Sequence, residues 1–251
     1  MEVITSRRNP LCQHLRRLAD SASCRREARE FLCDSPKLLR EALLWHADLH
    51  TVVSTEGLEL PGLPDGVRRV TVPPEVMEAV SPARTPQGVL CVCGLPDITP
   101  PDPLPGGRYV VLDGVQDPGN VGTILRTADA FGADGMLLLG NCADPFGPKT
   151  VRASMGAVFR CPVFACEADT LGRLLRQSGL PLFGAALRAD AMDVREVDLH
   201  RAAVAIGSEG QGLSDKVLAL CEKTLIIPMS EHCESLNAAA AAAVLLWEAA
   251  R

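Results

Sequence analysis

The stretch that decides the fold is Tyr109-Val-Val-Leu-Asp-Gly-Val115, which leads directly into Gln116-Asp-Pro-Gly-Asn-Val-Gly122. The first seven residues are mostly apolar and rich in valine, which predicts a buried strand. The proline and glycine that follow favour a sharp turn, and Asn120 is placed to cap a helix that we expect from Val121 onward. We therefore predict a strand-turn-helix unit, the building block of a parallel α/β sheet.

The alternation of strand and helix continues to the end of the chain. Strands are predicted at 136–139, 162–165, 182–187, 202–206 and 224–227, and helices at 150–159, 169–177, 214–221 and from 236. Short apolar strands interleaved with helices indicate a mostly parallel sheet that helices cover on both faces. Such sheets bind ligands at the carboxyl ends of their strands, so motifs that follow the strands are candidates for one shared pocket.

A proline-rich segment separates this region from the N-terminal part of the chain. Residues 96–107 hold five prolines and the Gly106-Gly107 pair, and they can continue neither helix nor strand. Before this segment, helical spacing at 9–18 and 36–45 alternates with short β-rich runs at 50–54, 67–72 and 88–93. We therefore predict a small α/β domain over 1–95, a linker over 96–107 and a larger α/β domain over 108–251.

Composition is that of an ordinary globular protein. The 251 residues are 47% hydrophobic and 22% charged. No apolar run reaches the roughly 18 residues that a membrane-spanning helix needs. The polar, basic start is followed by no apolar segment of the kind found in signal peptides. We expect no membrane association and a cytoplasmic location.

Charge gives two opposing indications about nucleic acid. The net charge of −6 argues against a protein that coats nucleic acid, because such proteins carry a basic excess. Residues 1–29, however, hold seven arginines against three acids, a local balance of +4. This basic stretch is either a phosphate-contacting arm or the solvated face of a helix.

The ten cysteines include no Cys-x-x-Cys pair. In a chain without a secretory signal, we expect them to be reduced and mostly small buried residues. Cys91 and Cys93 lie on the same side of a predicted strand, where two thiols could bind metal or be oxidised. Nothing nearby in the sequence completes a set of four ligands, so we predict no metal site.

Two further motifs follow predicted strands. The run Ile206-Gly-Ser-Glu-Gly-Gln-Gly-Leu213 fits either a nucleotide-binding glycine loop or a flexible connection, and an acid between glycines favours the functional reading. Ile227-Pro-Met229 ends a strand, and Glu234-Ser-Leu-Asn237 precedes the last helix. Ser235 is well placed as the N-cap of that helix, whereas helix propensity does not explain an asparagine at 237 inside its first turn.

In this order and spacing, the three motifs resemble those of the SpoU/TrmH family (SPOUT class) of RNA 2'-O-ribose methyltransferases. The resemblance implies an α/β catalytic domain with a trefoil knot, S-adenosylmethionine as the cofactor and a homodimer. It implies catalytic roles for Asn120, Arg126, Glu209, Ser235 and Asn237. It implies cofactor contacts for Leu187, Gly207, Gly210, Ile227, Met229 and Leu236.

The resemblance extends into the N-terminal region. Ser6-Arg-Arg-Asn-Pro10 and Arg84-Thr-Pro-Gln-Gly88 resemble the family's RNA substrate-binding domain, whereas Cys33-Asp34-Ser35 replaces a common Glu-Gly. The loop Ser230-Glu-His-Cys233 lacks a glycine that relatives often carry, and we expect His232 and Cys233 to be loop residues without a catalytic role. Expected RNA contacts are Arg7, Arg8, Lys149 and Arg152.

Transfer of a methyl group to a ribose 2'-hydroxyl needs that oxygen in line with the methyl group and an acceptor for its proton. A guanidinium, with a pKa above about 12, is a poor general base. We therefore expect Arg126 to orient the hydroxyl and stabilise the developing alkoxide, while a substrate phosphate or Glu209 takes the proton.

Three alternatives remain open beside a ribosomal RNA methyltransferase. The substrate could be transfer RNA, although the N-terminal accessory domain favours ribosomal RNA. The chain could also be a catalytically silent RNA-binding protein on the same scaffold. A nicotinamide-dependent oxidoreductase is disfavoured, because no Gly-x-Gly-x-x-Gly follows the first strand of the larger domain.

Overall fold

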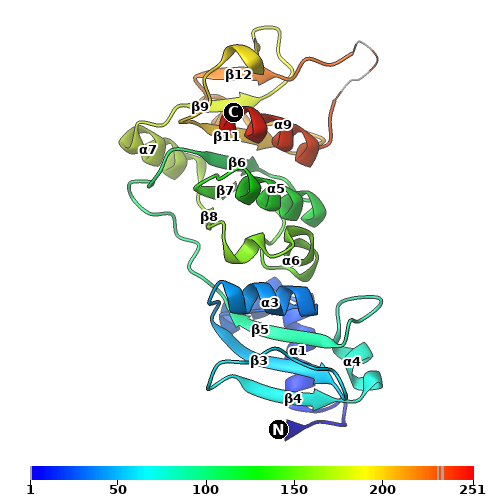
Figure 1. Cartoon of the computed structure of the whole chain (residues 1–251). Helices are drawn as coiled ribbons and strands as arrows, with labels where there is room; N and C mark the ends of the chain where they lie inside the picture. Colours follow the sequence, from blue (N-terminus) through cyan, green and yellow to red (C-terminus); the bar gives the residue numbers. More distant parts are fainter. Residues whose placement is uncertain (1, 231, 233–234) are drawn as a thin grey trace. The chain divides into compact units, whose positions relative to one another are not determined.

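The computed structural model describes residues 2–230, 232 and 235–251. They form two compact units (Figure 1). Unit 1 comprises Met1–Pro96 and Phe146–Phe159, and unit 2 comprises Asp97–Pro145 and Arg160–Arg251. The sequence analysis places 146–159 within the larger domain, whereas the contacts group this segment with unit 1. The rings of Phe146 and Phe159 explain the grouping, because their centroids lie 5.2 and 6.1 Å from that of Phe31.

Unit 1 is built on a mixed five-stranded sheet. In spatial order its strands are β1 (Glu2–Val3), β4 (Arg68–Val72), β3 (Leu49–Thr55), β5 (Val89–Gly94) and β2 (Glu30–Cys33). The pairs β1/β4 and β3/β4 are parallel, while β5 runs antiparallel to both β3 and β2. The helices of unit 1 are α1 (Pro10–Asp20), α2 (Ala22–Ala28), α3 (Pro36–Leu44), α4 (Pro74–Val80), α6 (Pro148–Ser154) and the 3₁₀ turn η1 (Ala157–Phe159).

The two faces of this sheet are covered differently. On one face, aliphatic side chains of the strands pack with α1 and α4 into a continuous core that includes Leu15, Leu32, Val53, Val76 and Leu90. On the other face, α3 and α6 lie against β5 and β2. Both α1 and α3 have a proline at their first helical position. The residue before each proline, Asn9 or Ser35, caps the helix, since its side chain accepts a hydrogen bond from an amide of the first turn.

Unit 2 is built on a seven-stranded sheet in which every described pair of strands is parallel. In spatial order the strands are β10 (Met192–Asp193), β12 (Lys223–Ile226), β9 (Leu182–Ala185), β11 (Ala203–Gly207), β6 (Tyr109–Asp113), β7 (Gly135–Leu139) and β8 (Val163–Ala165). The helices are α5 (Pro118–Ala130), α7 (Ala168–Ser178), α8 (Asp215–Leu218), α9 (Ala238–Ala250) and the 3₁₀ turn η2 (Val194–Glu196). The predicted α/β fold with a large parallel sheet is confirmed.

Helices cover both faces of the larger sheet. Tyr109, Val111 and Ala205 share a core with Leu171 and Leu174 of α7. The intervening strand residues point to the opposite face, since side chains alternate along a strand. That face is covered by α5 and α9, which pack against each other (Figure 1).

The proline-rich segment after Pro96 lies largely on unit 2. The Ala165 amide donates to the Ile98 carbonyl at 2.8 Å, and the Leu104 amide donates to the Ser178 hydroxyl at 2.9 Å. Leu104 is buried in the core beside α7, and the Tyr109 hydroxyl donates to the Pro105 carbonyl. These contacts fix the entry of the chain into β6.

No helix among the described residues is long and apolar enough to cross a membrane. The trefoil knot implied by the family resemblance stays a prediction.

Candidate active site

A cavity of about 530 Å³ opens in unit 2 where β9, β11 and β12 end. This volume lies within the roughly 300–1,000 Å³ typical of small-molecule sites. Carboxyl ends of parallel strands are also where α/β sheets bind their ligands. The cavity is lined by Ala185, Ala186, Leu187, Arg188, Ile206, Gly207, Ser208, Glu209, Gln211, Gly212, Leu213, Leu218, Leu225, Ile226, Ile227, Met229, Ser235, Leu236, Asn237, Ala238 and Ala241.

The glycine loop after β11 folds back tightly on itself. Backbone hydrogen bonds join Ser208 and Gly212 in both directions, at 3.2 and 2.8 Å. A Cβ atom at Gly207 would lie 2.1 Å from the carbonyl carbon of Gly212, so no larger residue fits there without moving the backbone. Gly212 itself has φ +69°, a conformation that favours glycine. The absence of a side chain at Gly207 therefore lets the two ends of the loop pack backbone against backbone at the edge of the cavity.

A buried carboxylate fixes the far end of this loop. Asp113, the last residue of β6, is buried and accepts a hydrogen bond of 2.6 Å from the Ser214 amide. Ser214 in turn caps α8. Sequence reasoning missed Asp113, although an acid at the carboxyl end of a central strand was a usable signal.

Polar side chains from the three motifs meet beside the cavity. Asn120 Nδ2 donates to Glu209 Oε1 at 2.7 Å. Asn237 Nδ2 lies 2.9 Å from the same Glu209 oxygen and 3.0 Å from Asn120 Oδ1. These three side chains, which we call the amide-carboxylate network, come from α5, from the glycine loop and from the start of α9. The network holds one oxygen of the Glu209 carboxylate in place.

Two expected helix caps are wrong. Asp117 caps α5 by accepting from the Asn120 amide at 2.7 Å, and Asn120 lies inside the first turn. The reason is Pro118, which takes the first helical position and so starts the helix earlier than expected. Asn237, and not Ser235, caps α9: its Oδ1 accepts from the Ala239 and Ala240 amides at 2.9 and 3.3 Å. One asparagine side chain thus starts α9 with its oxygen and joins the network with its nitrogen.

Most predicted site residues of unit 2 lie at this cavity. Glu209, Ser235 and Asn237 line it, as do five of the predicted cofactor contacts: Leu187, Gly207, Ile227, Met229 and Leu236. Asn120 joins through the network, whereas Gly210 is not among the lining residues. Sequence reasoning missed other lining residues such as Arg188 and Ser208, which directly follow strand ends or neighbour a predicted contact.

Arg126 is exposed on α5 and does not line the cavity. It lies six residues after Asn120, or about 9 Å further along the helix axis. Among the described residues it forms no hydrogen bond or ion pair, and the side-chain partners of Glu209 are Asn120 and Asn237. Its guanidinium is available to a ligand.

The predicted RNA contacts all belong to unit 1. Arg7, Arg8 and Lys149 have exposed side chains. Arg152 is half-exposed and forms an ion pair with the buried Asp34 carboxylate. This pair gives the buried carboxylate at position 34 a charged partner.

The arginines of the basic N-terminal stretch differ in burial. Arg25 is buried and donates to the carbonyls of Leu18 and Ala19 near the end of α1, so it acts structurally. The exposed arginines of the stretch remain on the surface.

Unit 1 has its own cavity of about 380 Å³ with a cationic lining. It is lined by Asp34, Ser35, Lys37, Leu38, Ala83, Arg84, Thr85, Gln87, Arg152 and Met155. Lys37 and Arg84 are exposed and form no ion pair among the residues described. We call this cavity the cationic pocket.

The loop before α9 is only partly described. Glu231, Cys233 and Glu234 lie outside the described residues, so the expectations for Cys233 and for the missing glycine fall outside as well. His232 is described as an exposed turn residue.

Comparison with known proteins gives a consistent set of similarities. Residues 107–247 match the family model described as the SpoU rRNA Methylase family. The chain is 32% identical over 225 residues to the 23S rRNA (guanosine(2553)-2'-O)-methyltransferase RlmP of Bacillus subtilis, with 89% of each chain covered.

Solved structures resemble the chain over almost its whole length. The AdoMet-bound rRNA methyltransferase of Sinorhizobium meliloti superposes with a TM-score of 0.87 at 31% identity, covering 99% of this chain and 97% of that one. The methyltransferase AviRb of Streptomyces viridochromogenes, in complex with AdoMet, also gives 0.87 at 28% identity and covers 97% of each chain.

Proposed function

Because the chain belongs to the SpoU rRNA Methylase family, we propose that it methylates ribose 2'-hydroxyls of ribosomal RNA with S-adenosylmethionine as methyl donor. The observation that carries this proposal is the meeting of the three motifs beside the cavity of unit 2. The amide-carboxylate network joins residues that are far apart in sequence. Such a network serves a reaction centre better than it serves packing, because its members are exposed or half-exposed.

The cavity fits the proposed cofactor. Leu187, Met229 and Leu236 supply apolar surface for a heteroaromatic ring, and the backbone of the glycine loop supplies hydrogen-bonding groups. Because Gly207 has no Cβ, the backbone of Gly212 can pack directly against it, which keeps the glycine loop closed beside the cavity. When bound, S-adenosylmethionine supplies an electrophilic methyl group on a sulfonium.

The network suggests how Glu209 acts. Its Oε1 accepts from two amide groups, which fixes the plane of the carboxylate, while no described residue bonds to Oε2. The second oxygen is therefore left for a ligand or for the hydroxyl proton. Arg126 is too basic to accept that proton; it orients the ribose hydroxyl and stabilises the alkoxide as it forms.

Ribosomal RNA is favoured as the substrate class by the extent of the similarity. The ribosomal RNA methyltransferases of Bacillus subtilis and Sinorhizobium meliloti align with unit 1 as well as unit 2. Unit 1 would bind RNA outside the reaction centre through the cationic pocket and the exposed Arg7, Arg8 and Lys149. A cytoplasmic location stays a prediction.

The protein would act as a homodimer through α9. Val244 and Trp247 lie three residues apart on one face of this helix and are 38% and 56% exposed. The ring of Trp247 meets that of Phe131, the residue that follows α5, edge-on. Exposed aromatic surface of this kind favours association with a second copy. Light scattering at micromolar concentration tests this expectation, and a monomer would contradict it.

The test of the activity is transfer of labelled methyl groups to unmodified ribosomal and transfer RNA, followed by mapping of alkali-resistant linkages. We expect label at a ribose 2'-oxygen of ribosomal RNA, and the Arg126→Ala variant should incorporate it at a rate about 100-fold or more lower. Label in transfer RNA alone would contradict the substrate class. Binding of cofactor and RNA without transfer to either would identify a silent RNA-binding protein instead.

A further inference from the structure

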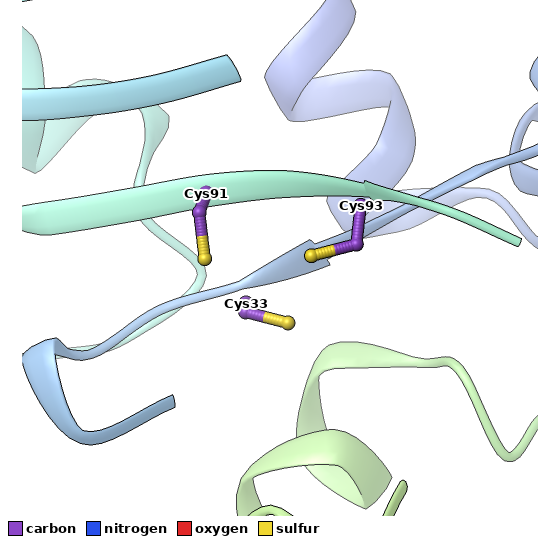
Figure 2. Close-up of side chains that lie close together, drawn as sticks. All are labelled: Cys33, Cys91 and Cys93. Carbon is purple, nitrogen blue, oxygen red and sulfur yellow. The ribbon is translucent and has the colours of Figure 1, made fainter. Parts of the chain in front are cut away.

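Three thiols converge in unit 1, and none of them lines the cavity of unit 2. Cys33 ends β2 and lies directly opposite Cys91 of the antiparallel β5, and Cys93 follows two residues later on β5. Cross-strand neighbours hold their Cβ atoms about 4.5–5.5 Å apart, and residues two apart on a strand share a face. The three Sγ atoms all lie within 4.8 Å of one another. Figure 2 shows the three side chains lying close together.

The group is sealed from solvent. Cys33, Cys91 and Cys93 are each 0% exposed. They lie on the sheet face that α3 and α6 cover. On the opposite face, the same two strands fill the core with Leu32, Leu90 and Val92. Aliphatic residues thus suffice for packing on one face, whereas thiols are concentrated on the other.

No other set of three or more His, Cys, Asp or Glu residues converges in this way within the part of the chain that the structure describes. The other six described cysteines form no such group. Cys12 and Cys24 lie in α1 and α2 of unit 1, and the remaining four lie in unit 2. The convergence was not predictable from the sequence, because Cys33 is remote from Cys91 and Cys93 along the chain.

An all-sulfur ligand set selects thiophilic metals. With metal–sulfur bonds of about 2.3 Å, three sulfurs around a trigonal ion lie about 4.0 Å apart. Sulfurs up to 4.8 Å apart need to move toward their common centre by no more than roughly 0.5 Å to reach that spacing. Small side-chain rotations within β2 and β5 cover this distance.

We propose that Cys33, Cys91 and Cys93 form a binding site for one thiophilic metal ion, with Cu(I) as the ion that the geometry fits. Structural zinc sites use four ligands. No fourth His, Cys, Asp or Glu ligand joins the group among the described residues, and the burial leaves no solvent-facing position for water. Cu(I) accepts three sulfur ligands. It enters as Cu(I), so no electron is transferred, and the protons of the coordinating thiols leave to solvent.

The bound ion would crosslink β2 to β5 beneath α3 and α6. Because a metal that binds the folded state adds its binding free energy to folding, the site would stabilise unit 1. The site is independent of the proposed methyl transfer, since none of its ligands belongs to the cavity of unit 2.

The test is an anaerobic titration of the fully reduced protein with Cu(I) against a competing chelator, and with Zn(II) against a chromophoric indicator. We expect one Cu(I) per chain, an ultraviolet thiolate-to-copper band and a higher melting temperature. Cys91→Ser should lose the band and the stoichiometric binding. Cys12→Ser is the matched control, because Cys12 is equally buried but lies in the core on the other sheet face.

Cys91→Val guards against misfolding, since an apolar residue of similar size keeps the core filled. It should bind cofactor as the native protein does and fail to bind Cu(I). Three results would overturn the proposal: equal Cu(I) binding by Cys91→Val and the native protein, stoichiometric Zn(II) without Cu(I), or a disulfide between two of these cysteines in the protein as isolated.

Discussion

The two units arrange their functional side chains in opposite ways. In unit 2, Glu209 is bonded to two amide side chains from other elements. In unit 1, Lys37 and Arg84 line a pocket without an ion-pair partner among the described residues. The first arrangement fixes geometry before a ligand arrives, which catalysis requires. The second leaves positive charge free to attract phosphates, which favours binding and association rate. We therefore expect changes in unit 2 to alter turnover and changes in unit 1 to alter affinity.

The largest expected effect comes from Arg126→Ala. Removal of the exposed guanidinium should lower kcat by about 100- to 1,000-fold, the usual loss when one transition-state charge stabiliser is removed. Cofactor affinity should stay unchanged, because Arg126 does not line the cavity. Methyl-transfer kinetics and calorimetry measure the two quantities. Arg176→Ala is the control, since it removes an exposed arginine from α7 on the other face of the sheet.

Gly207→Ala should nearly abolish cofactor binding. The added Cβ would lie 2.1 Å from a backbone atom of Gly212, so the glycine loop must open to accept it. Gly210→Ala is a matched control within the same loop, because nothing lies within 4 Å of a Cβ there. Calorimetric titration with S-adenosylmethionine compares the two. Equal affinities would show that the closed form of the loop is not the binding form.

Glu209→Gln separates two roles of the network. A glutamine oxygen can still accept from Asn120 and Asn237, so the loop should keep its position. Glutamine cannot accept the hydroxyl proton. If Glu209 takes that proton in the native protein, kcat of the variant should fall by about 100-fold or more. Measurement of kcat and of cofactor Kd checks this, and an unchanged kcat would assign the proton to a substrate phosphate.

The double variant Lys37→Ala/Arg84→Ala tests the other side of the comparison. RNA affinity should fall, and the slope of log K against log salt should shrink by about 0.7–0.9 for each lost phosphate contact. The turnover at saturating RNA should stay near normal. Lys216→Ala/Arg176→Ala removes two exposed cations from unit 2 and serves as the control. A fall in kcat instead of affinity would break the division of roles between the units.

The larger domain was predictable because its signals are local. Strands such as β6 and β11 are apolar runs, and each is followed directly by a motif whose proline or glycine residues indicate a turn. Short elements of unit 1 gave no such signal: β2 has four residues, and α2 and α4 have seven each. Four to seven residues cannot establish a period, so their structure depends on pairing with elements distant in sequence.

The sequence predicts which residues belong to the candidate site, but it does not predict which of them contact one another. The motif residues 209, 235 and 237 do line the cavity. The bond from Asp113 to Ser214 could not be foreseen, because it joins residues 101 positions apart. The cap of α9 was misassigned for a related reason. Asn237 serves the helix and the network at once, and only the position of Glu209 shows why asparagine suits both.

The smallest expected effect is a pH dependence of unit 1. Glu30 bonds to His50 at 2.7 Å and to His14 at 2.6 Å, and His50 also contacts Asp48. The hydrogen bond to Glu30 raises the pKa of His50 above its usual 6.5. Burial raises the pKa of Glu30, but the hydrogen bonds from His50 and His14 outweigh it and bring this pKa below its usual 4.5.

The sign of the effect follows from the two shifts. The raised pKa of His50 contributes stability that is fully present below about pH 6.5 and is lost as pH rises through its folded pKa. The lowered pKa of Glu30 contributes stability that is present above about pH 4.5 and is lost as pH falls. Both contributions are present together between these limits. His50→Gln should therefore lower the melting temperature by a few degrees at pH 6 and by less at pH 8.5, which thermal melts can measure. The affinity of unit 2 for its cofactor should stay the same at both pH values. A loss of cofactor affinity in this variant would mean that the two units are coupled, and the comparison between them would have to be redrawn as one cooperative system.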